Sequence, residues 1–303
     1  MDTGRAAHSA GEAIPGPVAG GDRTFPAERT DPVPFTPDTL LWDMAGDIRV
    51  LLYLPAALVL QVAHPAVGAG VDEHSVFRTD PWGRARRSLD SLQLWVYGGD
   101  GAVEEGRRLR RLHRDIKGTD TRGRAYHALN PAPYAWVHAT GFPVFLRAAE
   151  YLFHPFDEAG ERRLHAEARR LGRILGIRER DMPGSVEEFW TYFDTVVHDE
   201  LERTVIVEEL LDPRRSVPPP DGAAAVLRLL WPVLRPALLR LQVFVTKGLL
   251  PPVARERLDV PWTPRDERRL RLLGRVVRTV VPRLPERLRY LPSAHAARRA
   301  ARA

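Results

Sequence analysis

Histidine is the residue type with the widest chemical potential in this chain. The 303 residues include ten histidines and no cysteine. The absence of cysteine excludes disulfide frameworks, zinc knuckles, iron–sulfur clusters, covalently attached haem and thiol catalysis, because each of these needs a sulfur atom. The HExxH, P-loop, GxGxxG and GxSxG motifs are also missing. Zinc proteolysis, nucleotide-dependent chemistry and serine hydrolysis therefore lose their usual support, and metal or haem binding through imidazole becomes the first question.

His113 lies in a segment, residues 102–117, that the sequence predicts to be a helix ending at Gly118. Helical spacing places His113 beside Leu109 and Gly106, on the inward edge of a helix whose other face is lined with arginines. Such a histidine can be a hydrogen-bonded core residue. It can also be the axial ligand of a haem iron, with Gly106 leaving room for the macrocycle, and the residues alone leave both interpretations open.

A second candidate group is basic. Arg84 and Arg87 are three residues apart, hence on one helix face, with Ser88 beside them. A solvated basic face is one interpretation. The other is a polar cluster over a pocket that binds propionates or tunes an iron-bound oxygen.

The remaining histidines are weaker candidates. His64 and His74 bracket a glycine-containing segment that we expect to be a turn, and either could orient it through hydrogen bonds or act as a ligand. His138, within the apolar stretch WVHAT, is predicted to be a core residue or a ligand. Helix-end or surface positions are expected for three others: His154, His165 and His198.

The elements that must position these residues are predicted to be helices, because strand-like alternation of useful length is missing. The expected helices cover residues 38–63 (one or two helices), 82–97, 102–117, 132–153, 158–175 and 186–211, with a turn at 64–75 and loops at 119–131 and 212–222. Ser185 and Glu188 have the spacing of a capping box. We expect an all-α protein with a disordered segment at 1–35, a single helical domain at 36–292 and a flexible basic tail at 293–303.

Charge is unevenly distributed along the chain. The formal net charge is +6, yet twelve arginines against three acidic residues follow position 264. This argues against a general nucleic-acid-binding protein and predicts weak, salt-sensitive contact of the C-terminal segment with anionic membranes. No secretory signal pattern is visible at the start, and the apolar stretch from Val50 to Val71 is interrupted by prolines and His64, as in a core helix. We therefore expect a cytoplasmic protein that can also lie at the periphery of the membrane.

Four separated blocks of the sequence resemble the MpaB-like oxygenases, a family related to the catalytic domain of rubber oxygenase, the latex-clearing protein. The blocks are HPAVGAGVDEHSVFRTDPWGRARRS, LHRDIKG, YHALNPAPYAWVHAT and MPGSVEEFWTYF, and the resemblance covers roughly residues 40–290. It implies an all-α domain with a distantly globin-like core that holds non-covalent haem b. His113 resembles the proximal ligand of that family. Arg84, Arg87 and Ser88 resemble its distal Arg, Lys and Thr, with Arg in place of Lys and Ser in place of Thr.

What the resemblance implies is a haem b-dependent oxygenase that adds O₂ to an apolar, isoprenoid-like substrate and cleaves a C=C bond. O₂ would bind opposite His113, and Arg84 or Arg87 would stabilise the developing negative charge. One alternative is a non-enzymatic haem or lipid-binding protein at a membrane surface, favoured by the apolar segment Ala223 to Val253 with its recurring basic residues. Another is a family member that has lost its haem.

Overall fold

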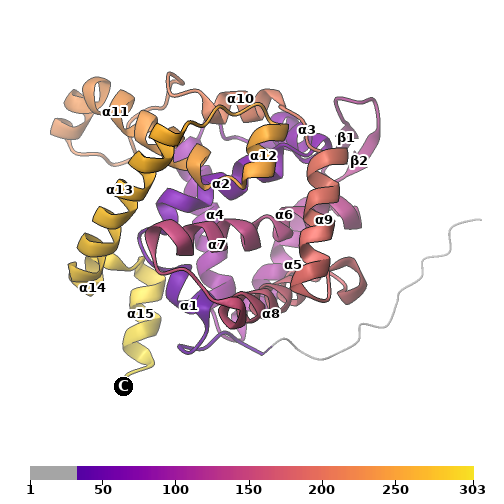
Figure 1. Ribbon diagram of the computed structural model, residues 1–303, viewed down its shortest axis with the longest axis horizontal. Coiled ribbons are helices and arrows are strands. Elements are labelled where there is room, and N and C mark those ends of the chain that lie inside the picture. Colours follow the sequence, from indigo (N-terminus) through magenta and orange to yellow (C-terminus); the bar gives the residue numbers. More distant parts are fainter. Residues whose placement is uncertain (1–32) are drawn as a thin grey trace, which may run out of the picture. The chain divides into compact units, whose positions relative to one another are not determined.

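The computed structural model describes residues 33–303, which are mostly helical, as the sequence predicts (Figure 1). The α-helices are α1 (Leu40–Met44), α2 (Val50–Val62), α3 (Pro65–His74), α4 (Pro81–Tyr97), α5 (Gly101–His113), α6 (Pro131–Ala139), α7 (Gly141–Leu152), α8 (Glu158–Ile174), α9 (Val186–Asp199), α10 (Val205–Leu211), α11 (Ala225–Leu249), α12 (Pro252–Arg257), α13 (Pro264–Val280), α14 (Glu286–Arg289) and α15 (Pro292–Ala300). Short 3₁₀ turns lie at Glu179–Asp181 and Val281–Arg283, and two strands, β1 (Lys117–Thr119) and β2 (Ala125–His127), complete the fold.

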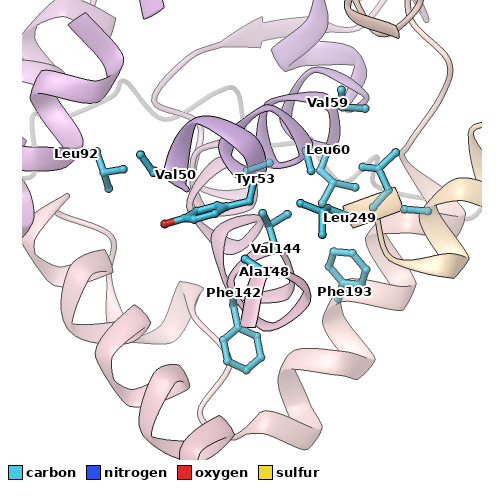
Figure 2. Close-up of a cluster of buried hydrophobic side chains, with 14 of the residues drawn as sticks. Val50, Tyr53, Val59, Leu60, Leu92, Phe142, Val144, Ala148, Phe193 and Leu249 are labelled. Carbon is cyan, nitrogen blue, oxygen red and sulfur yellow. The ribbon is translucent and has the colours of Figure 1, made fainter. Parts of the chain in front are cut away.

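Helix α2 is the centre of the core. Its sequence, VLLYLPAALVLQV, is apolar around nearly the whole circumference, and a helix of this kind must be surrounded by protein. It contacts α3, α6, α7, α10 and α11. Figure 2 shows Tyr53 and Leu60 of α2 near side chains from α7, α9 and α11, and Val50 beside Leu92 of α4. Seven of its residues are buried: Val50, Tyr53, Ala56, Ala57, Val59, Leu60 and Val62.

Helices α4 and α5 form an antiparallel helical hairpin. The turn between them uses Gly99 at φ 54°, a left-handed conformation that favours glycine. Two turns before the end of α4, Ser91 Oγ donates a 2.6 Å hydrogen bond to Glu105 of α5. Arg108 donates two 2.6 Å hydrogen bonds to the same carboxylate, which is almost fully buried. This cluster fixes the register of the two helices because an unpaired buried carboxylate would be costly.

The segment 64–75, predicted to be a turn, is helix α3 and leaves α2 at an angle of 106°. Pro65 occupies the first helical position, where its missing N–H is harmless. Gly68 does not serve a turn. A Cβ at this position would lie 2.6 Å from the carbonyl oxygen of Val62 and 3.0 Å from Thr204, so glycine permits close helix packing.

The segment 119–131, predicted to be a loop, contains most of a β-hairpin. Strands β1 and β2 pair antiparallel with Gly118 opposite Tyr126. Helix α5 consequently ends at His113, four residues before the predicted end, since Ile116 accepts a backbone hydrogen bond from Ala128 instead of continuing the helix. A three-residue strand is too short to give a recognisable alternation in the sequence.

Two predicted long helices are each divided into two. Residues 132–153 form α6 and α7, which meet at Thr140, and residues 186–211 form α9 and α10. The break between α9 and α10 is held by tertiary hydrogen bonds: Glu202 N–H donates to Ala63 O at 2.9 Å, and Thr204 Oγ1 donates to Val62 O at 2.9 Å. Ser185 accepts from the Glu188 N–H as predicted, while the Glu188 carboxylate accepts from Gly184 rather than closing the capping box.

Both ends of the described chain differ from expectation. The expected disorder of residues 1–32 lies outside the described residues, but Phe35 is buried in the core and Arg170 stacks on its ring at 4.5 Å. The predicted flexible tail, 293–303, is mostly helix α15, which packs on α4 with Ala294 fully buried. Arg298 anchors it by donating to Trp42 O at 3.1 Å. Alanines at helical spacing and a buried arginine contact explain the order of this basic segment.

A buried ion network ties the start of α2 to the C-terminal segment. Asp47 is fully buried and accepts hydrogen bonds from Arg49 at 2.6 and 2.7 Å and from Arg289 at 3.1 Å. Arg49 also donates to Leu152 O at 2.8 Å and lies 3.5 Å above the Phe153 ring. The network therefore joins three parts of the chain that are far apart in sequence.

We predict that Asp47→Asn lowers the free energy of unfolding by about 3–5 kcal/mol, because it leaves Arg49 and Arg289 without their buried counter-charge. Urea unfolding measures the effect. The matched control is Glu158→Ala, which removes an exposed pair with Arg162 and should change the value by less than about 0.5 kcal/mol. Equal, small effects of both substitutions would contradict a stabilising role for the network.

Candidate functional site

The hairpin brings the two main groups of candidate residues to the same end. Ser91 of α4 faces Glu105 and Arg108 of α5. Continuing this antiparallel register by two helical turns puts the first turns of α4, with Arg84 and Ser88, level with the last turn of α5, which ends at His113. The two groups of residues therefore lie at the same end of the hairpin, and the His113 ring packs against Tyr134 of α6.

His113 has one ring nitrogen committed and one available. Nδ1 lies 2.8 Å from the carbonyl oxygen of Leu109, one turn earlier. A carbonyl oxygen can only accept, so Nδ1 carries a proton, and in the neutral imidazole the lone pair is then on Nε2. Nε2 has no hydrogen-bond partner among residues 33–303. The ring is partly buried and packs edge-on against Tyr134, with centroids 6.4 Å apart.

Gly106 has a structural role that differs from the predicted one. A Cβ at this position would collide with the carbonyl oxygen of Ile174, at the end of α8. The glycine lets α5 pack closely on α8, and the space beside it is filled by protein backbone. The expectation that Gly106 leaves room for a macrocycle is wrong, whereas Leu109 contributes to the site through its carbonyl oxygen.

Arg84 is a partly buried cation without an acidic partner. Its guanidinium donates to Ser88 Oγ, and the hydroxyl in turn donates to Arg84 O at 3.2 Å. No carboxylate among residues 33–303 forms an ion pair with Arg84. Burial, together with the neighbouring Arg87, lowers the pKa of Arg84 from its usual value, but an arginine stays charged. The side chain is therefore available to an anionic group.

Arg87 is used differently. It is exposed and forms an ion pair with Asp80 at 3.1 Å. Asp80 also caps α4 by accepting from the Gly83 N–H at 2.9 Å, and this hydrogen bond and Arg87 lower the pKa of its carboxyl group. Arg87 thus supports the start of α4 and is separated in role from Arg84.

His64 and His74 also differ in their environments. His74 Nε2 lies 3.3 Å from Lys117 O and links α3 to β1, as the hydrogen-bonding interpretation predicts. His64 precedes α3, is largely buried, and its Nδ1 has no hydrogen-bond partner among residues 33–303. Burial lowers the pKa of His64, so its imidazole is neutral near pH 7. The Nδ1 atom of His64 is therefore available as a ligand or as a hydrogen-bond partner.

His138 belongs to a small pocket between α6, α8 and α9. The pocket has a volume of about 30 Å³, roughly the space of one water molecule. Its lining includes His138, His165, Phe142, Met182, Phe189 and Tyr192. Burial lowers the pKa of His138 to about 4 and also lowers that of His165. His165 was predicted at the surface but is buried. It lies seven residues before the buried Gly172, hence on the same face of α8, and this spacing was the signal available in the sequence.

Clusters of three or more His, Asp or Glu side chains that could hold a metal ion do not occur within residues 33–303. The end of the α4–α5 hairpin therefore carries the imidazole of His113, the partly buried guanidinium of Arg84 and the hydroxyl of Ser88.

Comparisons with known proteins identify the family of the chain. Residues 42–279 match the family model described as "ER-bound oxygenase mpaB/B'/Rubber oxygenase, catalytic domain". The chain belongs to this family. Two curated relatives, the uncharacterized proteins Rv2237 of Mycobacterium tuberculosis and Mb2261 of Mycobacterium bovis, are each 30% identical over 249 residues, 78% of this chain and 91% of the relative. No solved structure matches the chain significantly.

The family match covers every candidate residue, from His64 to His138. It supports an oxygenase in general terms, with O₂ and a small-molecule substrate, and confirms the resemblance found in the sequence. The cofactor and the roles of individual residues must be inferred from the residues of this chain.

We predict that the protein loses stability as the pH falls from 7 to 5. Because the pKa of His138 is about 4 in the folded state and about 6.5 when unfolded, the unfolded chain binds the proton more tightly over this range. His138 alone then costs about 2 kcal/mol of unfolding free energy between pH 7 and 5. Urea titrations at both pH values measure the loss. His138→Gln should reduce it, and the control His198→Gln, at an exposed position, should not. An unchanged loss in His138→Gln would assign the effect to other groups.

Proposed function

We propose that this protein is a haem b-dependent oxygenase in which His113 would hold the haem through its imidazole. The observation that carries the proposal is the state of His113: Nδ1 is fixed by the Leu109 carbonyl oxygen, and Nε2 has no partner among the described residues. Histidines that ligate metals commonly donate their other ring N–H to a backbone carbonyl, which sets the tautomer. Membership in an oxygenase family supports the same function.

The donor set at the hairpin end fits haem. A haem iron needs only one protein ligand, which is consistent with a site that lacks a cluster of acidic and histidine side chains. Arg84, partly buried and without a carboxylate partner among residues 33–303, fits the propionates or the negative charge that develops during oxygen chemistry. Gly106 lies outside the proposed cofactor site because α8 fills the space beside it.

Bound haem would supply the iron that activates O₂. The protein would supply the rest. His113 would hold the cofactor through Nε2, and the Leu109 carbonyl oxygen would keep the imidazole oriented and electron-rich. Arg84 would hold a fixed positive charge and donate hydrogen bonds, oriented by Ser88. Because a guanidinium does not release its proton near neutral pH, Arg84 would act as an electrostatic group and not as a general base.

For the substrate we propose an apolar, isoprenoid-like molecule, with cleavage of a C=C bond as the reaction. The support is the resemblance of the four sequence blocks to the MpaB-like oxygenases, a family related to rubber oxygenase. We propose the cytoplasm as the site of the reaction.

His113→Ala is predicted to abolish the Soret band of the purified protein, produced with a haem precursor, and to leave far-UV helix content unchanged. Added imidazole should restore part of the band, because only the ligand atoms are missing. The matched control is His127→Ala. Both ring nitrogens of His127 are occupied, by Arg114 O at 2.8 Å and the Leu129 N–H at 3.1 Å. Loss of haem in His138→Ala or His64→Ala, with full haem in His113→Ala, would move the ligand to one of those residues.

Arg84→Gln is predicted to keep haem but to slow O₂ consumption with an isoprenoid substrate by about 100-fold, the usual cost of removing one hydrogen-bond donor to a developing charge. Arg87→Gln, which removes an exposed pair, should change the rate much less. An oxygen electrode measures both variants. Equal rates for Arg84→Gln and wild type would remove Arg84 from the mechanism.

A further inference from the structure

Exposed hydrophobic side chains are concentrated in one part of the chain. On the first half of α11, Val226, Leu229 and Val233 are 68%, 80% and 75% exposed. Four more exposed residues of this helix continue the set: Leu230, Leu234, Leu238 and Leu241. Isolated exposed leucines are ordinary, but a continuous apolar face on one helix marks an interaction site.

This face is presented by an anchored helix. The second half of α11 packs against α2, with Val245 and Leu249 fully buried. In the first half, Trp231 points inward, donates to Val217 O at 2.8 Å and packs edge-on against Trp82 at 6.0 Å. Figure 1 shows this part of α11 at the left edge of the view, next to α13. The contacts on the buried side of α11 therefore fix the position of its exposed apolar face.

The same helix carries positive charge only. Residues 225–249 contain no Asp or Glu and four basic residues: Arg228, Arg235, Arg240 and Lys247. None of the four forms an ion pair with a carboxylate in the described part of the chain. The neighbouring α13 repeats the pattern, because Leu272, Val276 and Val280 are exposed at helical spacing. Its Arg265, Arg268 and Arg275 also lack carboxylate partners within residues 33–303.

We propose that the outer face of α11 docks on the surface of a bilayer that contains anionic lipids. An apolar stripe bordered by unpaired arginines is the composition of a helix that lies in the membrane interface. By length and composition α11 could also cross a membrane, but Val245 and Leu249 are inside the protein, so the helix cannot be surrounded by lipid.

The charge of α11 also favours a bilayer, rather than a second copy of the chain, as the partner of this face. In a two-fold symmetric dimer the same patch lies opposite itself. The arginines of α11 would then face each other without acidic residues to pair with. An anionic lipid surface supplies the missing counter-charge. The docking surface does not depend on the proposed oxygenase function, since haem and substrate play no part in it.

Co-sedimentation with vesicles tests the proposal. The full chain should bind vesicles of phosphatidylcholine and phosphatidylglycerol at low salt, and weakly or not at all those of pure phosphatidylcholine. Val226→Ser/Leu229→Ser/Val233→Ser should reduce the partition coefficient by at least about tenfold, because it removes apolar area that enters the interface. Arg228→Gln/Arg240→Gln should reduce it by about fivefold for each arginine, and added salt should have the same effect.

The matched control is Val76→Ser/Leu94→Ser/Val205→Ser, which changes three exposed apolar residues elsewhere (46%, 45% and 59% exposed) and should leave binding unchanged. Failure of the wild type to bind anionic vesicles would overturn the proposal, as would equal binding by the α11 serine variant. Light scattering adds a further test: a wild-type dimer that the α11 serine variant converts to a monomer would assign the face to a second copy.

Discussion

The burial of α2 organises the helices around it. Seven side chains of VLLYLPAALVLQV are buried, which supplies the main favourable term of folding, and five helices contact α2, while Leu51 stays 44% exposed. The chain must turn sharply where the apolar run ends, and it does so at His64, where α3 departs at 106°. The buried Asp47–Arg49–Arg289 network then closes the other end of α2 against the C-terminal segment.

The candidate site lies on the α4–α5 hairpin, whose two helices are joined by buried polar contacts. Glu105, paired with Arg108 and Ser91, sets the register, and Gly106 lets α5 approach α8. These local contacts bring Arg84 and His113 to one end without requiring either residue for stability. On the other side of α4, the Trp82–Trp231 contact joins the start of the same helix to α11. A membrane-docked α11 would therefore keep the site close to the phase in which apolar substrates collect.

Much of this arrangement could be predicted from the sequence. The apolar run of α2 and the ranges of α4 and α8 follow from local signals in the sequence, and the four blocks around His113 pointed to the oxygenase family. Other features depend on distant partners. Gly68 and Gly106 look like turn or pocket residues until the backbones of Val62 and Ile174 lie against them. The break between α9 and α10 is fixed by hydrogen bonds to α2, and α15 is ordered by Arg298 reaching Trp42. Arg84 and Arg87 share a helix face, and only the position of Asp80 separates their roles.

We propose that the end of the α4–α5 hairpin is the cofactor site. Hydrogen–deuterium exchange of the purified protein with and without bound haem, followed by mass spectrometry, tests it directly, because a bound cofactor slows local opening where it contacts the protein. We predict slower exchange in the last turn of α5, around His113, and in the first turns of α4, around Arg84. Slower exchange confined to α6, α8 and α9, around His138 and His165, with no change in the hairpin, would contradict it.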